Sequence, residues 1–478
     1  MRFPSFLINT VRSGIFLKEY RRQLWVTLSA TLITLCHGIA LGWFSPMLPI
    51  LLSPEKTPLN FEIDVNEASW MGAVISLGGV TGNFLFSFLM SRFGRKVSLY
   101  GLAVPNTCIW ILFYFAQSIE WLYVARVCAG ITGGGTFVVL PTFIGEIAGN
   151  SVRGRLSSFF TLTINTGTLV GFIIAAHVPY HVIPCVIIVL PLTYALLTTR
   201  FPETPQQLLR WGRVEEAQSS LKFYRNYDEK LQQKDQERAY QKQFDEMREA
   251  IMQQSKNSDS PSLRMSDICN KRAIKAIVTG LVLMIAGTFG GTFAFINYMS
   301  NIFGAVRTQL DPNTNTIIIG VVQIIGTLAS IYLVDRYGRK ILLIISCAGC
   351  GLSTAAFGTY AFFAEETDAD LSAYSAWLPV TIMAFVIFLA NVGITSVTMV
   401  VLVEILPQKI RAIATSICLG CLSGFAFTSL KAFPLLMHYV GLAATMWLCA
   451  TVCAFCLFYV SIFLEETKGR PLYQTDAN

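Results

Sequence analysis

The same short polar motif stands twice in the chain, as Ser91-Arg92-Phe93-Gly94-Arg95-Lys96 and as Asp335-Arg336-Tyr337-Gly338-Arg339-Lys340. Each copy lies in a short loop between two long apolar stretches. Because the copies are separated by about half of the chain, they predict an internal duplication. The sequence therefore indicates two similar bundles of membrane-spanning helices.

The composition supports a protein that lies mostly in lipid. Hydrophobic residues make up 53% of the chain, charged residues make up 14%, and the mean hydropathy is +0.54. A soluble domain of 478 residues has too little interior to remove so much apolar surface from water. A spanning helix needs about 20 apolar residues. The chain offers about twelve such stretches, which divide six and six: 24–45, 67–90, 97–117, 121–143, 156–178, 181–200, 274–298, 314–334, 341–363, 377–402, 412–433 and 440–464.

The loops predict the orientation and the domain organisation. Lys and Arg near the membrane ends fall almost entirely on one side, which the positive-inside rule makes cytoplasmic, with both termini there. The opposite loops are acidic, and the net charge of +7 thus follows from topology and calls for no nucleic-acid partner. No cleavable signal sequence is expected. The predicted parts are a cytoplasmic N-terminus (1–23), a six-helix bundle (24–200), a charged helical cytoplasmic linker (201–273), a second six-helix bundle (274–464) and a cytoplasmic tail (465–478).

No cofactor is predicted. The glycine run Gly133-Gly134-Gly135 is not followed by the lysine of a nucleotide-binding loop, so no ATP site is expected. The cysteines other than Cys269 fall within predicted spans without nearby His or acid partners, which favours packing over metal binding, and no disulfide is assigned. Glycines at four-residue spacing predict close helix packing: Gly130/Gly134, Gly167/Gly171, Gly287/Gly291 and Gly420/Gly424.

Charged residues predict a network at the cytoplasmic ends of the spans. Glu146 and Glu404 end spans in the two halves, and an arginine follows each of them seven positions later. Guanidinium groups from the repeated loops would bind these carboxylates while the protein faces outward, and opening inward would break the bonds. The alternative is that the basic residues only anchor topology. The predicted network comprises Arg92, Arg95, Glu146, Arg153, Asp335, Arg336, Arg339, Glu404 and Arg411.

An ordered set of strings makes the chain resemble the sugar porter family of the major facilitator superfamily, and within it the arthropod facilitated trehalose transporters. The strings include Gly42-Trp43-Phe44-Ser45-Pro46, Arg126 through Gly135, Pro141 through Glu146, Pro202-Glu203-Thr204-Pro205, Leu333 through Lys340, and Glu404-Ile405-Leu406-Pro407. The resemblance implies an all-α membrane protein with twelve transmembrane helices in two six-helix pseudo-repeats. It also implies a multi-pass plasma-membrane carrier that moves a sugar or polyol by alternating access and is not an enzyme.

The chain departs from the family where the sugar would bind. Gly287, Thr288 and Phe293 replace amides in span 7, Thr395 through Met399 replaces a Pro- and Trp-containing motif, and Leu422-Ser423 replaces Asn-Trp. What stays polar predicts the substrate-binding residues, which are Gln323, Asn391, Tyr298, Thr161 and Thr288. Amides suit solutes rich in hydroxyls because each offers a donor and an acceptor. The alternative is hydrogen bonding between helices, which is favoured for Thr161 and Thr288.

The sequence favours uniport, because the family position linked to proton coupling carries an acid and here is Ala40. His37 is the one histidine deep in a span, and a structural role is favoured for it over proton transfer. Two other functions remain open: a sensor on the same fold that transports poorly, and a carrier of a less polar solute. The predicted partners are a sugar or polyol and the lipid bilayer, and no protein partner is assigned.

Overall fold

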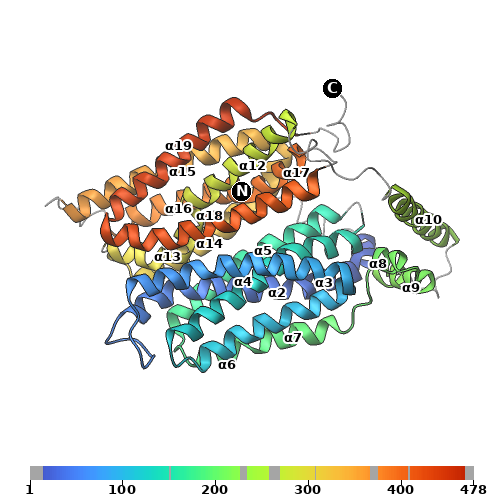
Figure 1. Cartoon of the computed structure of the whole chain (residues 1–478), viewed down its shortest axis with the longest axis horizontal. Coiled ribbons are helices and arrows are strands. Elements are labelled where there is room, and N and C mark those ends of the chain that lie inside the picture. The colour runs from blue at the N-terminus through green and yellow to red at the C-terminus, as the bar shows by residue number, and fades with distance from the viewer. Residues whose placement is uncertain are drawn as a thin grey trace.

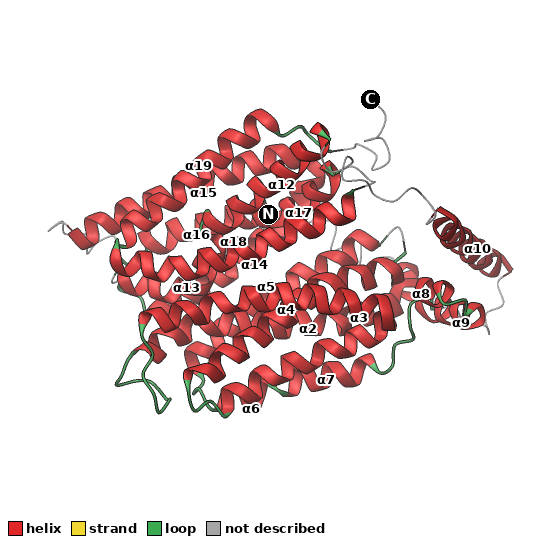
Figure 2. Ribbon diagram, in the orientation of Figure 1, coloured by secondary structure: helices red, strands yellow, loops and turns green. Residues whose placement is uncertain are grey.

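The computed structural model describes residues 14–149, 152–226, 234–257, 270–306, 308–366, 375–406 and 410–468, and these are almost entirely helical (Figure 2). The first half contains α2 (Gly14–Leu52), α3 (Val65–Tyr114), α4 (Ile119–Ile147), α5 (Arg153–His177), α6 (Val182–Ile187) and α7 (Val189–Thr198). The second half contains α12 (Lys271–Phe289), α13 (Thr292–Ala305), α14 (Pro312–Tyr337), α15 (Arg339–Glu366), α16 (Leu378–Val392), α17 (Ile394–Ile405), α18 (Arg411–Tyr439) and α19 (Leu442–Phe463). The halves lie side by side (Figure 1).

These helices supply twelve spans. Within the described residues, 10 helices are long and apolar enough to cross a membrane. The longest, α3, has 50 residues and contains two spans, because Gly94 interrupts it with φ 87° and ψ −178°. The shorter apolar stretch Val182–Thr198, formed by α6 and α7, supplies the remaining span. The predicted all-helical fold with six spans in each half is confirmed.

Besides the span divided between α6 and α7, two more spans expected as continuous helices are broken. The stretch 274–298 is divided between α12 and α13 by Gly291, whose φ of 95° only glycine adopts without strain. The stretch 377–402 breaks at Gly393 between α16 and α17. There the hydroxyl of Ser346 bridges the break, since it donates to the Leu389 carbonyl at 2.7 Å and accepts from the Ile394 amide at 3.1 Å. Hydropathy alone does not register such breaks.

Glycine contacts set the spacing of α3 and α4. A Cβ atom on Gly130 would lie 1.9 Å from the Ile75 carbonyl oxygen, and one on Gly78 would lie 2.2 Å from the Val127 carbonyl oxygen. The two backbones therefore touch directly. Larger side chains at these positions would force the helices apart.

Three helices of the linker follow the first half. They are α8 (Pro205–Arg210), α9 (Val214–Tyr224) and α10 (Lys234–Asn257), which extend beyond one end of the bundle (Figure 1). Two of them, α8 and α9, pack on the first half, while α10 packs on α8. Leu208, Leu221 and Phe244 bring the three helices together in a small apolar core. The Tyr224 hydroxyl donates to the Pro202 carbonyl at 2.7 Å, which anchors α9 to the segment that follows α7. The linker thus belongs structurally to the first half.

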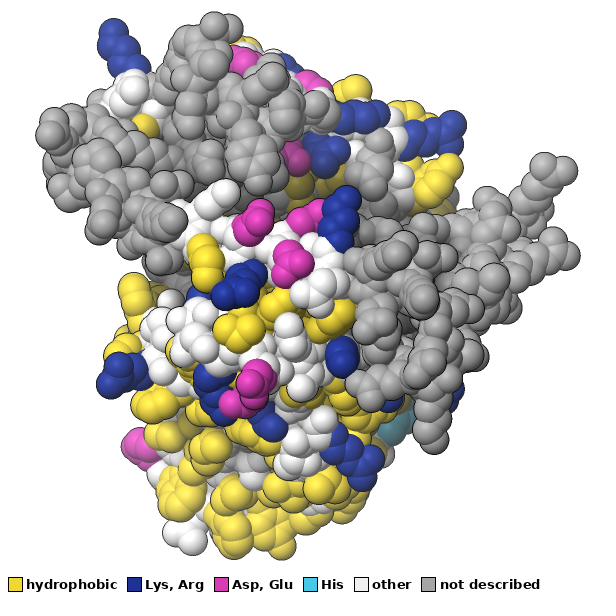
Figure 3. Space-filling view, turned by 90° about the vertical axis from the view of Figure 1, so that its right-hand side faces the viewer, with side chains coloured by type: hydrophobic (Ala, Val, Ile, Leu, Met, Phe, Trp, Pro, Cys, Tyr) yellow, Lys and Arg dark blue, Asp and Glu magenta, His cyan; other side chains and the backbone are white. Residues whose placement is uncertain are grey.

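The two ends of the bundle differ in charge. The end that carries Gly94 and Gly338 is called the basic end here, and the end that carries Asp64 and Asp311 is called the acidic end. Figure 3 faces the basic end and shows Lys and Arg side chains spread over it with Asp and Glu among them.

Candidate functional site

A compact charge cluster lies at the basic end of the first half. The turn at Gly94 starts a new helical segment, and Glu203 accepts hydrogen bonds from the first amides of that segment, at 3.2 Å from Arg95 and 3.0 Å from the next residue. The Arg95 guanidinium donates to Glu146 through Nε at 3.0 Å and Nη2 at 2.6 Å. The Thr204 hydroxyl donates to the other oxygen of Glu146 at 2.6 Å. The cluster is almost completely buried, with 6% and 8% of the Arg95 and Glu146 side chains exposed.

The second half repeats this cluster. Gly338 has φ 92°, and Glu466 accepts from the Arg339 amide at 2.9 Å and from the following amide at 3.1 Å. Arg339 pairs with Glu404 at 3.2 Å, and the Thr467 hydroxyl donates to Glu404. Burial by itself would raise the pKa of the Glu466 carboxyl, but four backbone N–H donors outweigh it and hold that pKa below its ordinary value.

The described ion pairs of the predicted charge network lie within each half. Arg95 meets Glu146 and Arg339 meets Glu404, in both cases because the turn after a span folds back on its own bundle. Contacts of these residues across the halves in an outward-facing conformation stay a prediction. Arg92 and Arg336 are exposed. The side chains of the remaining three predicted members lie outside the described part of the structure: Arg153, Asp335 and Arg411.

The clusters also contain residues that the predicted network omitted. Glu203 and Thr204 belong to the string Pro202-Glu203-Thr204-Pro205, and Glu466 belongs to the similar string Glu465-Glu466-Thr467 in the second half. These residues orient the carboxylate and the turn in their halves. Gln207 accepts from Arg95, and Arg210 lies 4.0 Å from Glu146. Their signal in the sequence was the Pro-Glu-Thr string and the helix directly after it.

At mid-depth, three polar side chains join the halves. Gln323 of α14 donates through Nε2 to the Asn165 amide oxygen on α5 at 2.9 Å. The Asn165 amide nitrogen in turn donates to Thr327, also on α14, at 2.6 Å. All three side chains are buried. Asn165 was not among the predicted site residues, although an asparagine within an apolar stretch marks such a contact.

The other predicted substrate-binding residues are placed separately. Asn391 donates to the Ile387 carbonyl at 2.8 Å, one turn back in α16. Thr288 donates to its own helix at 2.8 Å and is fully buried, whereas Thr161 is exposed. Tyr298 is buried, and its hydroxyl donates to the Leu430 carbonyl at 2.9 Å. The roles of all these residues in solute binding stay predictions.

Toward the acidic end, Arg126 is a buried cation that crosses from one half to the other. Its guanidinium donates to the Met71 carbonyl at 3.1 Å, the Ala40 carbonyl at 3.2 Å and the Asn297 side chain of the second half at 3.3 Å. It also lies 4.3 Å from the centre of the Phe44 ring. The position expected to hold an acid in a proton-coupled relative, Ala40, here supplies only its carbonyl oxygen.

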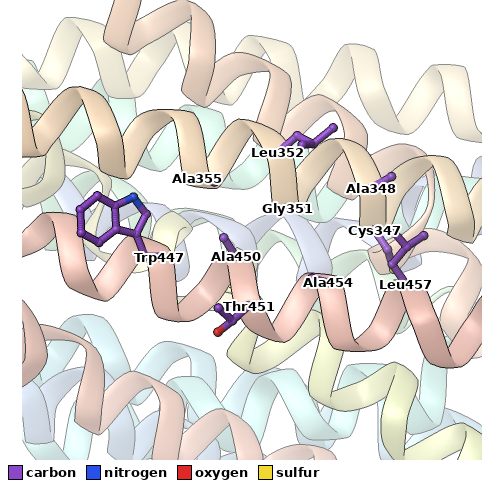
Figure 4. Close-up of a pocket in the computed structure, with 10 residues that line it drawn as sticks. All are labelled: Cys347, Ala348, Gly351, Leu352, Ala355, Trp447, Ala450, Thr451, Ala454 and Leu457. Carbon is purple, nitrogen blue, oxygen red and sulfur yellow. The ribbon is translucent and has the colours of Figure 1, made fainter.

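A groove between α15 and α19 is a poor candidate for a polar solute. Figure 4 shows its lining, in which Thr451 is the one hydroxyl among apolar and small side chains. Its residues all come from these two helices of the second half: Cys347, Ala348, Gly351, Leu352, Ala355, Trp447, Ala450, Thr451, Ala454 and Leu457. The groove therefore does not lie between the halves, where the polar contacts gather.

Comparison with solved structures defines the class of protein. The chain is similar to the inward open conformation of the xylose transporter XylE from E. coli, with a TM-score of 0.74 at 21% identity, covering 95% of this chain and 99% of that one. The partially occluded inward open conformation of the same transporter gives a TM-score of 0.72 at 19% identity, covering 92% and 99%. The fold is that of the major facilitator transporters.

Sequence comparison then identifies the family. Residues 30–478 match the family described as "Sugar (and other) transporter", and the chain belongs to that family. It is 29% identical over 455 residues to the facilitated trehalose transporter Tret1 of Bombyx mori, covering 95% of this chain and 86% of that protein. It is 29% identical over 460 residues to the Tret1-2 homolog of Drosophila simulans, covering 95% and 90%. The resemblance found in the sequence is thereby confirmed.

Proposed function

We propose that the chain moves a sugar or sugar-like polyol across the plasma membrane by facilitative transport with alternating access. Membership of the sugar transporter family supports the proposal, as do relatives named as facilitated trehalose transporters. The observation that carries it is the contact of Asn165 with Gln323 and Thr327 between the halves. Amides and hydroxyls that pair across this interface are able to exchange those partners for the hydroxyls of a solute.

The charge clusters support alternating access because they hold the segments of each half together, so that each half can move as one rigid body. A buried carboxylate bound by one guanidinium and one hydroxyl holds its loop, its span end and the following segment together. Because the Arg95–Glu146 and Arg339–Glu404 pairs lie inside the halves, they need not break when the halves move. Movement then concentrates at the interface between the halves, as in other carriers built from two repeats.

The basic end is proposed to face the cytoplasm, with both termini and the 201–273 linker on that side. The Lys and Arg loops at this end support it through the positive-inside rule. An epitope tag placed within 361–376 should react with antibody on intact cells, and a tag at either terminus should react only after permeabilisation. Reaction of a terminal tag on intact cells would contradict the orientation.

Uptake by vesicles tests the function. Purified protein in proteoliposomes should admit labelled trehalose, a hexose or a polyol faster than protein-free vesicles do, and excess unlabelled solute should compete. A double variant, Gln323→Ala with Asn165→Ala, is the matched control for a site between the halves. Binding of a sugar without flux would favour the transport-poor sensor instead.

A carrier of a less polar solute is the second candidate, and one observation favours it. Phe293 takes a position where the family carries an amide, and 38% of its surface is exposed at the start of α13. Met399 replaces a tryptophan of the family and Leu422 replaces an asparagine, and both pack against one apolar cluster. Uptake of an amphipathic solute, with none of the sugars, would select this candidate.

A further inference from the structure

Lys431 of α18 crosses between the halves near the acidic end. Its ammonium group donates to the Asn66 side-chain oxygen at 2.7 Å, to the Ser69 hydroxyl at 2.7 Å and to the Asn66 carbonyl at 3.3 Å. It also lies 4.4 Å from the centre of the Trp70 ring. Asn66, Ser69 and Trp70 all belong to the start of α3 in the opposite half. Three donors and a positive charge are thus satisfied across the interface.

The nearby acids are engaged elsewhere. Asp64 and Glu67 form a capping box on the first turn of α3, in which each carboxylate accepts from the backbone amide of the other residue, at 2.5 and 2.9 Å. The oxygens that receive Lys431 are therefore uncharged. A cation bound to neutral oxygens at a partly exposed site is released more easily than one in a buried ion pair, because water replaces the lost partners.

Uncharged contacts surround this point. The Tyr298 hydroxyl lies so close to Gly72 that a Cβ there would be 1.8 Å from it. The Ser300 amide donates to the Ser45 hydroxyl across the interface at 3.0 Å, and the rings of Trp70 and Phe427 lie 5.9 Å apart. The acidic end is thus closed by contacts between the halves. If the halves separate there, Lys431 loses its contacts with Asn66, Ser69 and Trp70.

We propose that Lys431 is a gate residue, which holds the acidic end closed by binding Asn66 and Ser69 of the opposite half. Its partners are lost when that end opens, so its contacts stabilise the conformation closed at the acidic end relative to the open one. This inference rests on the proposed alternating access, and under the proposed orientation the gate faces outside.

Distances between spin labels test the gate without any solute. Labels at Lys56→Cys and Tyr439→Cys, both on exposed residues of opposite halves at the acidic end, report its width once accessible native cysteines are replaced. Lys431→Met keeps the apolar stem and removes the charge, and it should raise the fraction of the longer distance at least about threefold. Lys431→Arg should restore the shorter distance in part.

The controls separate the gate from general damage. Lys468→Met is the matched control, because Lys468 donates to the Arg336 carbonyl within its own half at 2.8 Å, and it should leave the distances unchanged. Asn66→Ala removes an acceptor from the other side and should shift the distances in the same direction as Lys431→Met. If neither Lys431→Met nor Asn66→Ala alters the distances, the gate assignment is wrong, whatever the uptake assays show. If the distances shift but no sugar is carried, the gate stands and the proposed solute class falls.

Discussion

Single substitutions should lower the free energy of unfolding most at the buried ion pairs. Arg95 is 5% exposed, and its charge is matched by one carboxylate, Glu146. Replacing the carboxylate by an amide leaves this buried cation among neutral acceptors such as Gln207. The cost of an unmatched buried charge exceeds the net value of the bond that is lost.

Glu146→Gln should therefore lower the free energy of unfolding by at least about 1.5–3 kcal/mol, the range for hydrogen bonds to charged groups, because the unmatched buried charge adds to the lost bond. Glu404→Gln should cost less, because the Arg339 and Glu404 side chains are 16% and 20% exposed and water relieves part of the loss. Thermal unfolding in one detergent would measure both. Glu216→Gln is the control, since its pair with Arg213 is 52% and 55% exposed and should contribute about 0–1 kcal/mol.

The mid-depth contact makes a second prediction at the residue scale. Gln323→Ala should weaken binding of the transported solute by about 0.5–1.5 kcal/mol, the net value of one hydrogen bond. Asn165→Ala should not add its full effect, because both substitutions remove the same contact. Binding measured for the single and double variants gives the coupling. Strict additivity, with normal surface expression, would show that the two residues act independently.

At the scale of elements, glycine pairs with the same four-residue spacing differ in whether they contact a neighbouring helix. The Gly130/Gly134 pair faces backbone of α3, and Gly167 faces backbone of α2, where a Cβ would lie 2.2 Å from the Leu35 carbonyl oxygen. By contrast, a Cβ on Gly420 or Gly424 would have no neighbouring atom within 4 Å among the described residues. Four-residue spacing puts two glycines on one face of a continuous helix, which fails for Gly287/Gly291 because Gly291 breaks the helix. Where the helix is continuous, only the fold decides what that face meets.

Gly130→Ala should therefore destabilise the protein, because its methyl group would overlap the Ile75 carbonyl oxygen and α3 and α4 would have to separate. We expect about 1–3 kcal/mol, the usual cost of overpacking. Gly420→Ala should be neutral or slightly stabilising, since alanine has the higher helix propensity. Thermal unfolding of the two variants compares them directly, and equal melting temperatures would contradict the close packing of these helices.

The sequence predicted the membrane spans better than the breaks within them and the contacts between them. Hydropathy located the spans, because a length of apolar chain is a property of the segment itself. It did not locate the breaks at Gly291 and Gly393, which depend on what packs beside them. The pairing of Gln323 with Asn165 was equally out of reach, because it joins residues of opposite halves that only the assembled bundle brings together.

For the whole molecule, charged side chains bind within a half at the basic end and across the halves toward the acidic end. At the basic end, the described ion pairs of Glu146 and Glu404 lie within single halves. Toward the acidic end, Arg126 and Lys431 bind oxygens of the other half. Ion pairs inside a half persist as the halves move, while contacts between halves must break. The ion pairs at the basic end therefore stabilise each half, and the contacts at the acidic end control its opening.

The contacts of Arg126 also bear on whether solute transport is coupled to proton movement. A proton-coupled carrier needs a titratable group whose charge changes with conformation. The Arg126 guanidinium donates to the carbonyls of Met71 and Ala40 and to the amide of Asn297, none of which takes up a proton. His37 and Tyr298 are titratable side chains that interact electrostatically with Arg126, and of these His37 is the candidate that a test of coupling must address.

Uptake should therefore follow the solute gradient alone. In proteoliposomes, the internal solute concentration should rise to the external value and no further, with or without an imposed proton gradient. Ala40→Asp places a carboxylate on the helix that already contacts Arg126, and it is the informative comparison, since it introduces a titratable partner for that cation. Uptake by this variant should gain a dependence on pH that the unaltered protein lacks. Accumulation above the external concentration by the unaltered protein, abolished by a protonophore, would show instead that a group such as His37 carries the proton.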